Sequence, residues 1–253
     1  MIKIFRNTRK KLLSKGNIGK YFKYAFGEIV LVVIGILIAL QINNWNEQRK
    51  QNNKRQGYYY QLSDDLNRDL KFTNSIITEF ENYNQQYLNN LENYRNEEIT
   101  LGELYDDLMK LKITSSALTF NSSTVESLLN SGDIGLIDPD LRNKLIDLRR
   151  LQDLTIKRFE FTNTGKNQIV QNASLIMGSP QMQEKLRGHN QLKSLQNEDK
   201  LSELILALEA THRWKYLSQM EAVDRLKRMQ TELREIIETV QSKIKKGKNR
   251  NIG

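Results

Sequence analysis

The sequence contains no cysteine and only two prolines in 253 residues. Without cysteine the chain cannot form a disulfide, use a thiolate nucleophile or bind a metal through sulfur. Because proline is the strongest helix breaker and helix-forming residues such as Leu, Lys, Glu and Gln are common, long uninterrupted helices are predicted. With 38% hydrophobic and 27% charged residues, the composition is that of a folded chain. The sequence therefore favours an all-α protein.

Histidine is almost as scarce, since the chain contains only His189 and His212. No HExxH pattern occurs, and no group of Asp or Glu residues stands beside either histidine at the spacing of metal ligands. The glycines occur singly, so the P-loop, GxGxxG and GxSxG motifs are all missing. We therefore expect no metal, no cofactor and no catalytic site. His212 is expected to be a packed, hydrogen-bonded residue, and His189 to lie in a polar loop.

The net charge of +9 is concentrated at the two ends of the chain. Eight Lys and Arg residues lie within residues 1–23, and five more lie within residues 241–253. The region between the two ends is mildly acidic. A nucleic-acid-binding domain carries its basic residues on a folded face, so a nucleic-acid partner is not expected. Anionic membrane lipid is the expected partner of the N-terminal cluster. The basic residues assigned to the membrane surface are Arg9, Lys10, Lys11, Lys15, Lys20 and Lys23.

An almost unbroken apolar run precedes Trp45. From Tyr21 to Trp45, about 25 residues reach roughly 37 Å as a helix, which is enough for a hydrocarbon core of about 30 Å. Eleven Ile, Leu and Val residues within this run contribute about −3 to −7 kcal/mol to insertion, whereas one central charge costs roughly +3 kcal/mol. Residues 21–45 are therefore predicted to cross a membrane. The aromatic residues expected at its two interfaces are Tyr21, Phe22, Tyr24 and Trp45.

The flanking sequences favour a retained anchor over a cleaved signal peptide. The run is followed by QINNWNEQRK, which has no small-x-small cleavage site, and a long basic segment precedes it. The positive-inside rule then predicts a cytoplasmic N-terminus. We divide the chain into a basic cytoplasmic segment (1–20), a transmembrane helix (21–45), an extracytoplasmic body (46–240) and a basic tail (241–253). The tail is expected to be solvated, with anionic lipid or a cell-wall polymer as the alternative partner.

Glu28 places a carboxylate inside the predicted span. At 100° per residue it shares one side of the helix with Gly35 and Ala39, a small-xxx-small pair that permits close approach of a second membrane helix. We expect Glu28, Gly35 and Ala39 to form a packing face, because charged groups in membranes usually face a protein partner. The alternatives are that Glu28 reaches toward Lys20 or Lys23 at the interface, or that it belongs to an ion or proton path.

Beyond the span, apolar residues repeat at helical spacing. A stripe over residues 59–94, rich in tyrosine and with one longer interval around Leu70, predicts a long amphipathic helix. Further long helices with apolar stripes are predicted over residues 139–177 and 199–246. Helices of this kind bury their stripes against each other, so an antiparallel helical bundle is predicted. The tyrosine stripe is interpreted as core packing, with a site for a flat ligand as the alternative.

Local signals mark the ends of several helices. Capping boxes are expected where Thr100 precedes Glu103 and where Ser123 precedes Glu126, with Gly132 closing the second helix. Asp138 is expected to cap the next helix, because Pro139 suits a first turn in which no donor is needed. A short helix is predicted at Pro180, followed by a polar connection. The segment over residues 120–137 is interpreted as a connector packed against the long helices, with a ligand or partner loop as the alternative.

Two stretches resemble a known family. The first, GKYFKYAFGEIVLVVIGILIALQINNWNE (residues 19–47), resembles the N-terminal signature of a family of uncharacterised single-pass membrane proteins from Bacteroidota-type bacteria. The second, STVESLLNSGDIGLIDPDLRNKLIDL (residues 123–148), is similar to a further segment of that family. The resemblance implies a Gram-negative inner membrane with a periplasmic body, and it supplies neither a catalytic residue nor a ligand.

Together these features predict a membrane-anchored structural or interaction protein and not an enzyme. Its helical bundle would oligomerise or dock another membrane protein. The alternative is a sensor or a component of a transport complex, whose bundle relays a ligand or partner signal through the membrane helix. About twenty residues before the span cannot hold a signalling domain, so this alternative requires a second protein for its output.

Overall fold

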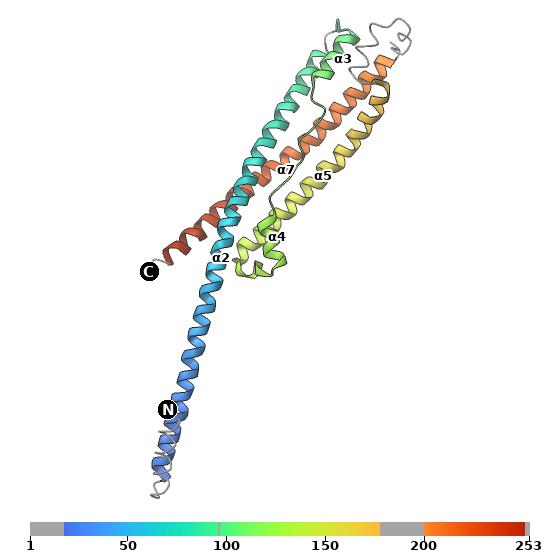
Figure 1. Ribbon diagram of the computed structural model, residues 1–253. Coiled ribbons are helices and arrows are strands. Elements are labelled where there is room, and N and C mark those ends of the chain that lie inside the picture. The colour runs from blue at the N-terminus through green and yellow to red at the C-terminus, as the bar shows by residue number, and fades with distance from the viewer. Residues whose placement is uncertain (1–17, 96, 178–199, 251–253) are drawn as a thin grey trace. The chain divides into compact units, whose positions relative to one another are not determined.

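The computed structural model describes residues 18–95, 97–177 and 200–250, and every regular element in these ranges is helical (Figure 1). The predicted all-α fold is therefore confirmed. Residues 1–17, the predicted short helix at Pro180, the polar connection and His189 lie outside the described residues. The elements are α2 (Ile18–Asn93), α3 (Leu101–Lys110), α4 (Ser123–Asn130), the 3₁₀ helix η1 (Asp133–Leu136), α5 (Pro139–Met177) and α7 (Leu201–Arg250).

The chain divides into two compact units, Met1–Gly57 and Tyr58–Gly253, and α2 contributes to both. In the first unit, α2 is the one helix among the described residues that is long and apolar enough to cross a membrane. None of its apolar run is buried. Leu31, for example, is 60% exposed and Leu37 is 58% exposed. The predicted span is therefore a helix whose apolar side chains have no protein cover.

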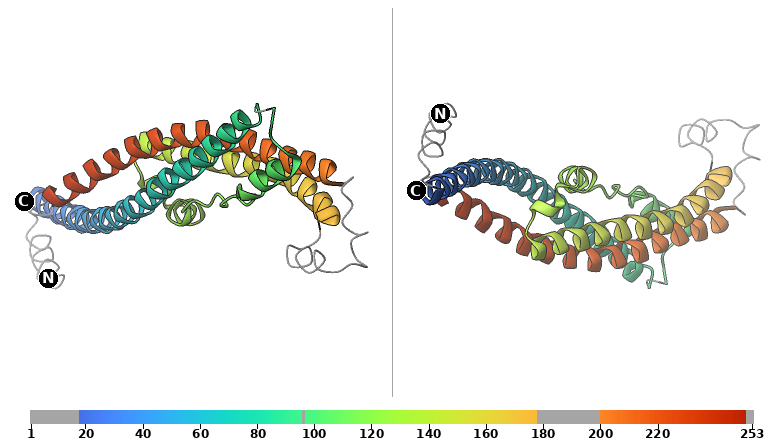
Figure 2. Two further views of the ribbon diagram at one scale, coloured as in Figure 1. Left: turned by 90° about the horizontal axis from the view of Figure 1, so that it is seen from above. Right: turned by 90° about the horizontal axis from the view of Figure 1, so that it is seen from below.

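In the second unit, the later part of α2 packs with α5 and α7 around one main core (Figures 1 and 2). Phe80 of α2 stacks on Phe159 of α5 with 5.2 Å between ring centroids. The predicted tyrosine stripe is confirmed as core packing, since Tyr59, Tyr83 and Tyr87 are buried. Further buried members of the main core include Leu62, Leu66, Ile76, Leu141, Leu145, Leu148, Leu226, Met229, Leu233 and Val240.

Contacts between the helices give their directions. Along α7, Ser218 meets Thr162 of α5 and Glu235 meets Lys144, so α5 and α7 run antiparallel. Helix α7 is likewise antiparallel to α2. Helices α2 and α5 run parallel to each other, because residues 111–122 carry the chain back along the bundle before α5 begins (Figure 1). The expected antiparallel packing thus holds for α7 against both of its long partners.

Two of the predicted helix starts are confirmed. Thr100 caps α3 in a capping box, in which the Glu103 amide donates to Thr100 Oγ1 at 3.2 Å and the Thr100 amide donates to Glu103 Oε2 at 2.9 Å. Asp138 precedes α5, where the Asp140 amide donates to Asp138 Oδ1 at 3.3 Å. Pro139 occupies the first position of that helix, which needs no donor. These starts depend on short-range interactions and can be predicted from sequence.

The predicted capping box at Ser123 and Glu126 is wrong. Helix α4 begins one residue earlier than that box requires, with Ser122 at the N-cap, and Ser122 makes no side-chain bond to the helix backbone. The Thr124 amide instead donates to the carboxylate of Asp65 on α2 at 3.2 Å. Gly132 does follow the end of α4 as predicted, with a φ of 75° that suits glycine.

The apolar stripe predicted over residues 199–246 was expected to include Met220, but this side chain is 42% exposed in α7. Lys215 and Gln219, which precede it, are buried instead. Helix α7 also continues to Arg250, four residues beyond its predicted end at Lys246, so most of the basic tail is helical.

Candidate functional site

Residues 111–122 form a connecting segment between α3 and α4 that has no regular secondary structure. Leu118 of this segment is buried in the main core, and Phe120 packs against it. A non-helical backbone in such a place must find hydrogen-bond partners for its own amides and carbonyls. Side chains of α2, α5 and α7 supply these partners, and they form the most polar part of the bundle interior.

Two buried lysines bind three successive carbonyls of the connecting segment. Lys215 of α7 donates from Nζ to the carbonyl oxygen of Lys112 at 2.5 Å and to that of Thr114 at 2.9 Å. Lys166 of α5 donates to the carbonyl oxygen of Ile113 at 3.1 Å. The ammonium group of Lys215 also lies 3.6 Å from the ring centroid of Tyr83, which is a cation–π distance. Both lysines therefore bind main chain, and Lys215 also binds an aromatic face.

Burial makes Lys215 an unusual lysine. Its side chain is only 2% exposed, and desolvation, together with the charges of Lys166 and Lys112, lowers its pKa to about 7. Desolvation also lowers the pKa of Lys166. In the part of the chain that the structure describes, neither ammonium group forms an ion pair with a carboxylate within 4 Å. Near neutral pH the Lys215 amine is therefore held close to its titration point.

His212 lies beside Lys215 on α7 and is fully buried. Its Nε2 atom is 3.0 Å from the carbonyl oxygen of Leu108, and its Nδ1 atom is 2.7 Å from the Tyr83 hydroxyl. A carbonyl can only accept, so Nε2 carries the proton and the Tyr83 hydroxyl donates to Nδ1. Burial lowers the pKa of His212 to about 4. The histidine is therefore neutral at pH 7, and its predicted packed, hydrogen-bonded role is confirmed.

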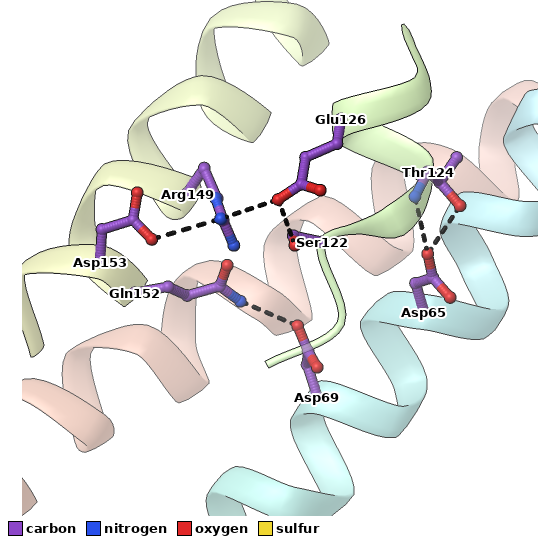
Figure 3. Close-up of polar contacts among 8 residues, drawn as sticks. All are labelled: Asp65, Asp69, Ser122, Thr124, Glu126, Arg149, Gln152 and Asp153. Carbon is purple, nitrogen blue, oxygen red and sulfur yellow. Dashed lines mark hydrogen bonds and ion pairs between the residues drawn. The ribbon is translucent and has the colours of Figure 1, made fainter. Parts of the chain in front are cut away.

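A buried carboxylate, Asp69 of α2, holds the other end of the connecting segment and also contacts Gln152 of α5 (Figure 3). Its Oδ1 atom accepts from the Asn121 amide at 2.7 Å and from Asn121 Nδ2 at 3.0 Å, while Oδ2 accepts from Gln152 Nε2 of α5 at 2.8 Å. Burial raises the pKa of Asp69, and these hydrogen bonds oppose that shift. Glu79, further along α2, accepts from the Ser116 amide and hydroxyl in the same way.

Asp65, one turn before Asp69, fixes the start of α4 (Figure 3). Its Oδ2 atom accepts from the hydroxyl of Thr124 at 2.6 Å as well as from the Thr124 amide. On the opposite side of α4, Arg149 of α5 pairs with Glu126 at 2.9 Å. Helix α4 is therefore bound to α2 and to α5, which confirms the interpretation of residues 120–137 as a packed connector.

Chemically, this arrangement serves to hold main chain. The groups that would be candidate catalysts, namely Lys215, Lys166, His212 and Tyr83, are occupied by carbonyls, by each other or by an aromatic ring. A surface groove of about 400 Å³ near the connecting segment is lined by residues such as Leu118, Phe159 and Asn163, and by none of these four. Among the described residues no group of three His, Cys, Asp or Glu side chains could hold a metal ion.

Sequence reasoning missed the polar members of this layer. Asp69 fills the interval around Leu70 in the α2 stripe, and Lys215 fills the interval before Met220 in the α7 stripe. Both stand at helical spacing from apolar neighbours. A polar residue in phase with an apolar stripe was therefore the available signal. Around Leu70 it was interpreted as a longer interval in the stripe, and at Lys215 it was not noticed.

The residues predicted at the membrane lie in the first unit. Phe22 is 67% exposed, Trp45 is 62% exposed, and a side chain added at Gly35 would meet nothing within 4 Å. Lys23 and Ala39 are exposed as well. Because the structure holds one copy of the chain, the packing face of Glu28, Gly35 and Ala39 stays a prediction. The side chains of Lys20, Tyr21 and Tyr24, and all of Arg9, Lys10, Lys11 and Lys15, lie outside the described residues.

Comparison with known proteins finds a family match within α2. Residues 28–86 match a family described as "Family of unknown function (DUF6090)". The matched range contains most of the apolar run together with Asp65, Asp69, Glu79 and Tyr83, and it ends before α5 and α7. No curated protein and no solved structure matches the chain. The resemblance to a family of unknown function is thus confirmed over this range, while the bacterial group and the signature stay predictions.

Proposed function

We propose that this protein is a membrane-anchored interaction protein. In this proposal α2 is retained in a bacterial inner membrane, the N-terminus is cytoplasmic, and the bundle stands in the periplasm. There the bundle oligomerises or docks a partner. The protein is proposed to have no enzymatic activity and no cofactor.

The observation that carries this proposal is the exposure of the apolar run in α2. All eleven Ile, Leu and Val side chains from Ile29 to Ile42 are between 39% and 62% exposed. In water, eleven exposed apolar side chains on one continuous helix would promote aggregation. In lipid the same side chains favour insertion by about −3 to −7 kcal/mol. A membrane is therefore the environment in which this helix is stable.

A second observation supports a structural role for the bundle. Its buried ionisable groups bind the connecting segment and fix the chain's own path, as Lys215 and Asp69 illustrate. An active site requires such groups to face a substrate-sized space. In this bundle the buried polar groups bind the chain's own backbone. Such a bundle is suited to act as a rigid body that binds partners through its outer surface.

The proposal is tested by cross-linking the chain in native membranes. Discrete homo-oligomers, or one stable heteromeric adduct, are expected. A chain that yields only monomer, and whose melting temperature shifts with a small molecule, would contradict the interaction role and favour a sensor. The continuity of α2 from Ile18 to Asn93 is the observation that favours this second candidate, because one helix then links the predicted span to the bundle.

The two candidates respond differently to a flexible insertion. Inserting Gly-Ser-Gly-Gly between Gly57 and Tyr58 interrupts α2 at the boundary of the two units. An interaction protein keeps its cross-linked adducts after this insertion, since anchoring and docking are both retained. A sensor that relays through α2 loses its output.

A further inference from the structure

The C-terminal end of α7 carries a dense cluster of positive charge. No Asp or Glu follows Glu238, whereas Lys243, Lys245, Lys246, Lys248 and Arg250 all follow it. Ile244 is the last residue of α7 that packs against the main core. The helix continues to Arg250, so its final turns extend past that contact.

Three of these lysines form one exposed face. Lys245, Lys246 and Lys248 are exposed, and at 100° per residue they fall within about half of the helix circumference. Asn249 lies in the middle of that sector. Lys243 points elsewhere, because its Nζ atom donates to Asp138 Oδ2 at 2.6 Å. We call Lys245, Lys246 and Lys248 the lysine face.

The lysine face lies at the end of the bundle to which the first unit is attached. The short stretch that contains η1 contacts both chain segments at that end. Asp133 accepts from the Tyr58 hydroxyl at 2.6 Å, and Asp138, five residues later, accepts from Lys243. Tyr58 is the first residue of the second unit and follows Gly57 directly in sequence. The charged end of α7 and the entry of α2 into the bundle are therefore neighbours.

Only a short stretch of α2 separates the predicted span from the bundle. From Trp45, at the edge of the predicted span, to Tyr58 the helix rises by about 20 Å. The Debye length at physiological ionic strength is about 8–10 Å, so the lysine face has to come about that close to the lipid head groups for the attraction to act.

We propose that the lysine face binds the anionic lipid head groups of the membrane that holds α2. This proposal rests on the proposed membrane anchor and adds a second, electrostatic contact between the bundle and the bilayer. Clustered lysines beside a membrane attract anionic lipid, and lysines at a helix C-terminus also suit the helix dipole. The bundle is then held at two points, through α2 and through the end of α7.

Nucleic acid is the other polyanion that a lysine cluster attracts. The remainder of the bundle is mildly acidic, and the lysine face occupies only the last turns of one helix. A nucleic-acid surface would need basic groups on the adjoining elements, where Asp133 and Asp138 lie instead. The observations therefore favour lipid.

The test uses the full chain, which contains no cysteine, so that one introduced cysteine carries one fluorophore. The label at Asn249→Cys reports on the lysine face. A label at Gly102→Cys on α3 reports on the other end of the bundle, where an added side chain meets nothing within 4 Å. A third label at Asn44→Cys reports on the anchor. Each protein is placed in nanodiscs that carry a head-group quencher, made of phosphatidylcholine alone or mixed with phosphatidylglycerol.

We expect the Asn249→Cys label to be quenched severalfold more in discs that contain phosphatidylglycerol. The excess should disappear at high salt and in the Lys245→Gln, Lys246→Gln, Lys248→Gln triple variant, with Gly102→Cys unquenched throughout. Equal quenching of Asn249→Cys in both discs, or quenching unchanged by the triple variant, overturns the proposal. So does an oligonucleotide that displaces the label from anionic discs at sub-stoichiometric concentration. Quenching at Asn44→Cys shows separately that the anchor is inserted, so a failure of the lysine face is distinguished from a failure of the anchor.

Discussion

The ammonium group of Lys215 lies over the ring of Tyr83, 3.6 Å from its centroid, and binds the carbonyls of Lys112 and Thr114. These residues come from α7, α2 and the connecting segment. One side chain thereby joins α7 to two parts of the chain that lie about a hundred residues or more before it in sequence. The stability of the bundle should depend on it.

Replacing Lys215 tests this dependence. Lys215→Met keeps an unbranched side chain of similar length but removes the donor to the carbonyls of Lys112 and Thr114. A hydrogen bond from a charged group contributes about 1.5–3 kcal/mol, so the free energy of unfolding should fall by roughly that amount. Lys157→Met is the matched control, because Lys157 is exposed on α5. It should change stability by less than about 0.5 kcal/mol. Urea unfolding followed by circular dichroism measures both, and equal effects would contradict the role assigned to Lys215.

His212 should make stability depend on pH in mild acid. Burial lowers the pKa of His212 from 6.5 in the unfolded chain to about 4 in the folded chain. Between these two values the unfolded state therefore binds more protons than the folded state. Stability therefore rises from pH 4 to pH 6.5 and is lost as the pH falls through this window, by up to about 3 kcal/mol. Asp69, with its raised pKa, acts in the opposite direction near the acid end of the window. The contribution of His212 is therefore measured as the difference in unfolding free energy between the parent chain and a variant that lacks the histidine.

The variant that isolates this effect is His212→Gln. A glutamine can donate from Nε2 to the Leu108 carbonyl and accept from the Tyr83 hydroxyl, but it does not titrate. The difference in unfolding free energy between the parent chain and His212→Gln should therefore shift with pH only between about 4 and 6.5. A difference that is constant across this range would show that His212 is not held neutral.

Asp65 should be needed to hold the start of α4. Asp65→Ala removes the acceptor of the Thr124 amide and hydroxyl, and loss of an N-cap acceptor costs about 0.5–2 kcal/mol. Asp64→Ala is the matched control. It removes the same charge from the preceding residue, whose side chain is exposed. Hydrogen exchange should be accelerated at the first amides of α4 in Asp65→Ala alone. Equal protection in the two variants would mean that another group caps this helix.

The predicted packing face of the membrane helix can be tested with single cysteines. Ala39→Cys places a thiol on the side shared by Glu28 and Gly35, and Leu37→Cys places one on the opposite side. If two copies pack along this face, oxidation in membranes should yield a disulfide-linked dimer for Ala39→Cys and much less for Leu37→Cys. Gly35→Leu should reduce the dimer, because a large side chain prevents close approach. Equal yields from the two cysteines would rule out a specific face.

Much of the fold follows from local sequence patterns. The long apolar run, the stripes of α2, α5 and α7, and the caps at Thr100 and Asp138 depend on residues within a few positions of one another. Such features can be predicted because their physical cause is short-range. Gly132 is a further case, since its positive φ is a backbone conformation that glycine adopts without the strain of a side chain.

The polar interior depends on contacts that sequence spacing does not reveal. Asp65 caps a helix that begins 58 positions later, which is why the local capping box at Ser123 was the wrong prediction. Lys215 and Asp69 interrupt apolar stripes, and their partners are carbonyls and amides of a segment without helical periodicity. The parallel order of α2 and α5 has the same origin, because it depends on where the connecting segment lies.

The central claim is that α2 anchors the chain in a membrane and that the bundle lies outside the cytoplasm. Gly102→Cys provides the most direct measurement, since this site is exposed on the bundle and the parent chain has no cysteine. In spheroplasts, a membrane-impermeant maleimide should label Gly102→Cys without lysis, and the labelled protein should remain with the membranes after alkaline washing. A protein that is labelled only after lysis, or that is released by the wash, would contradict this account.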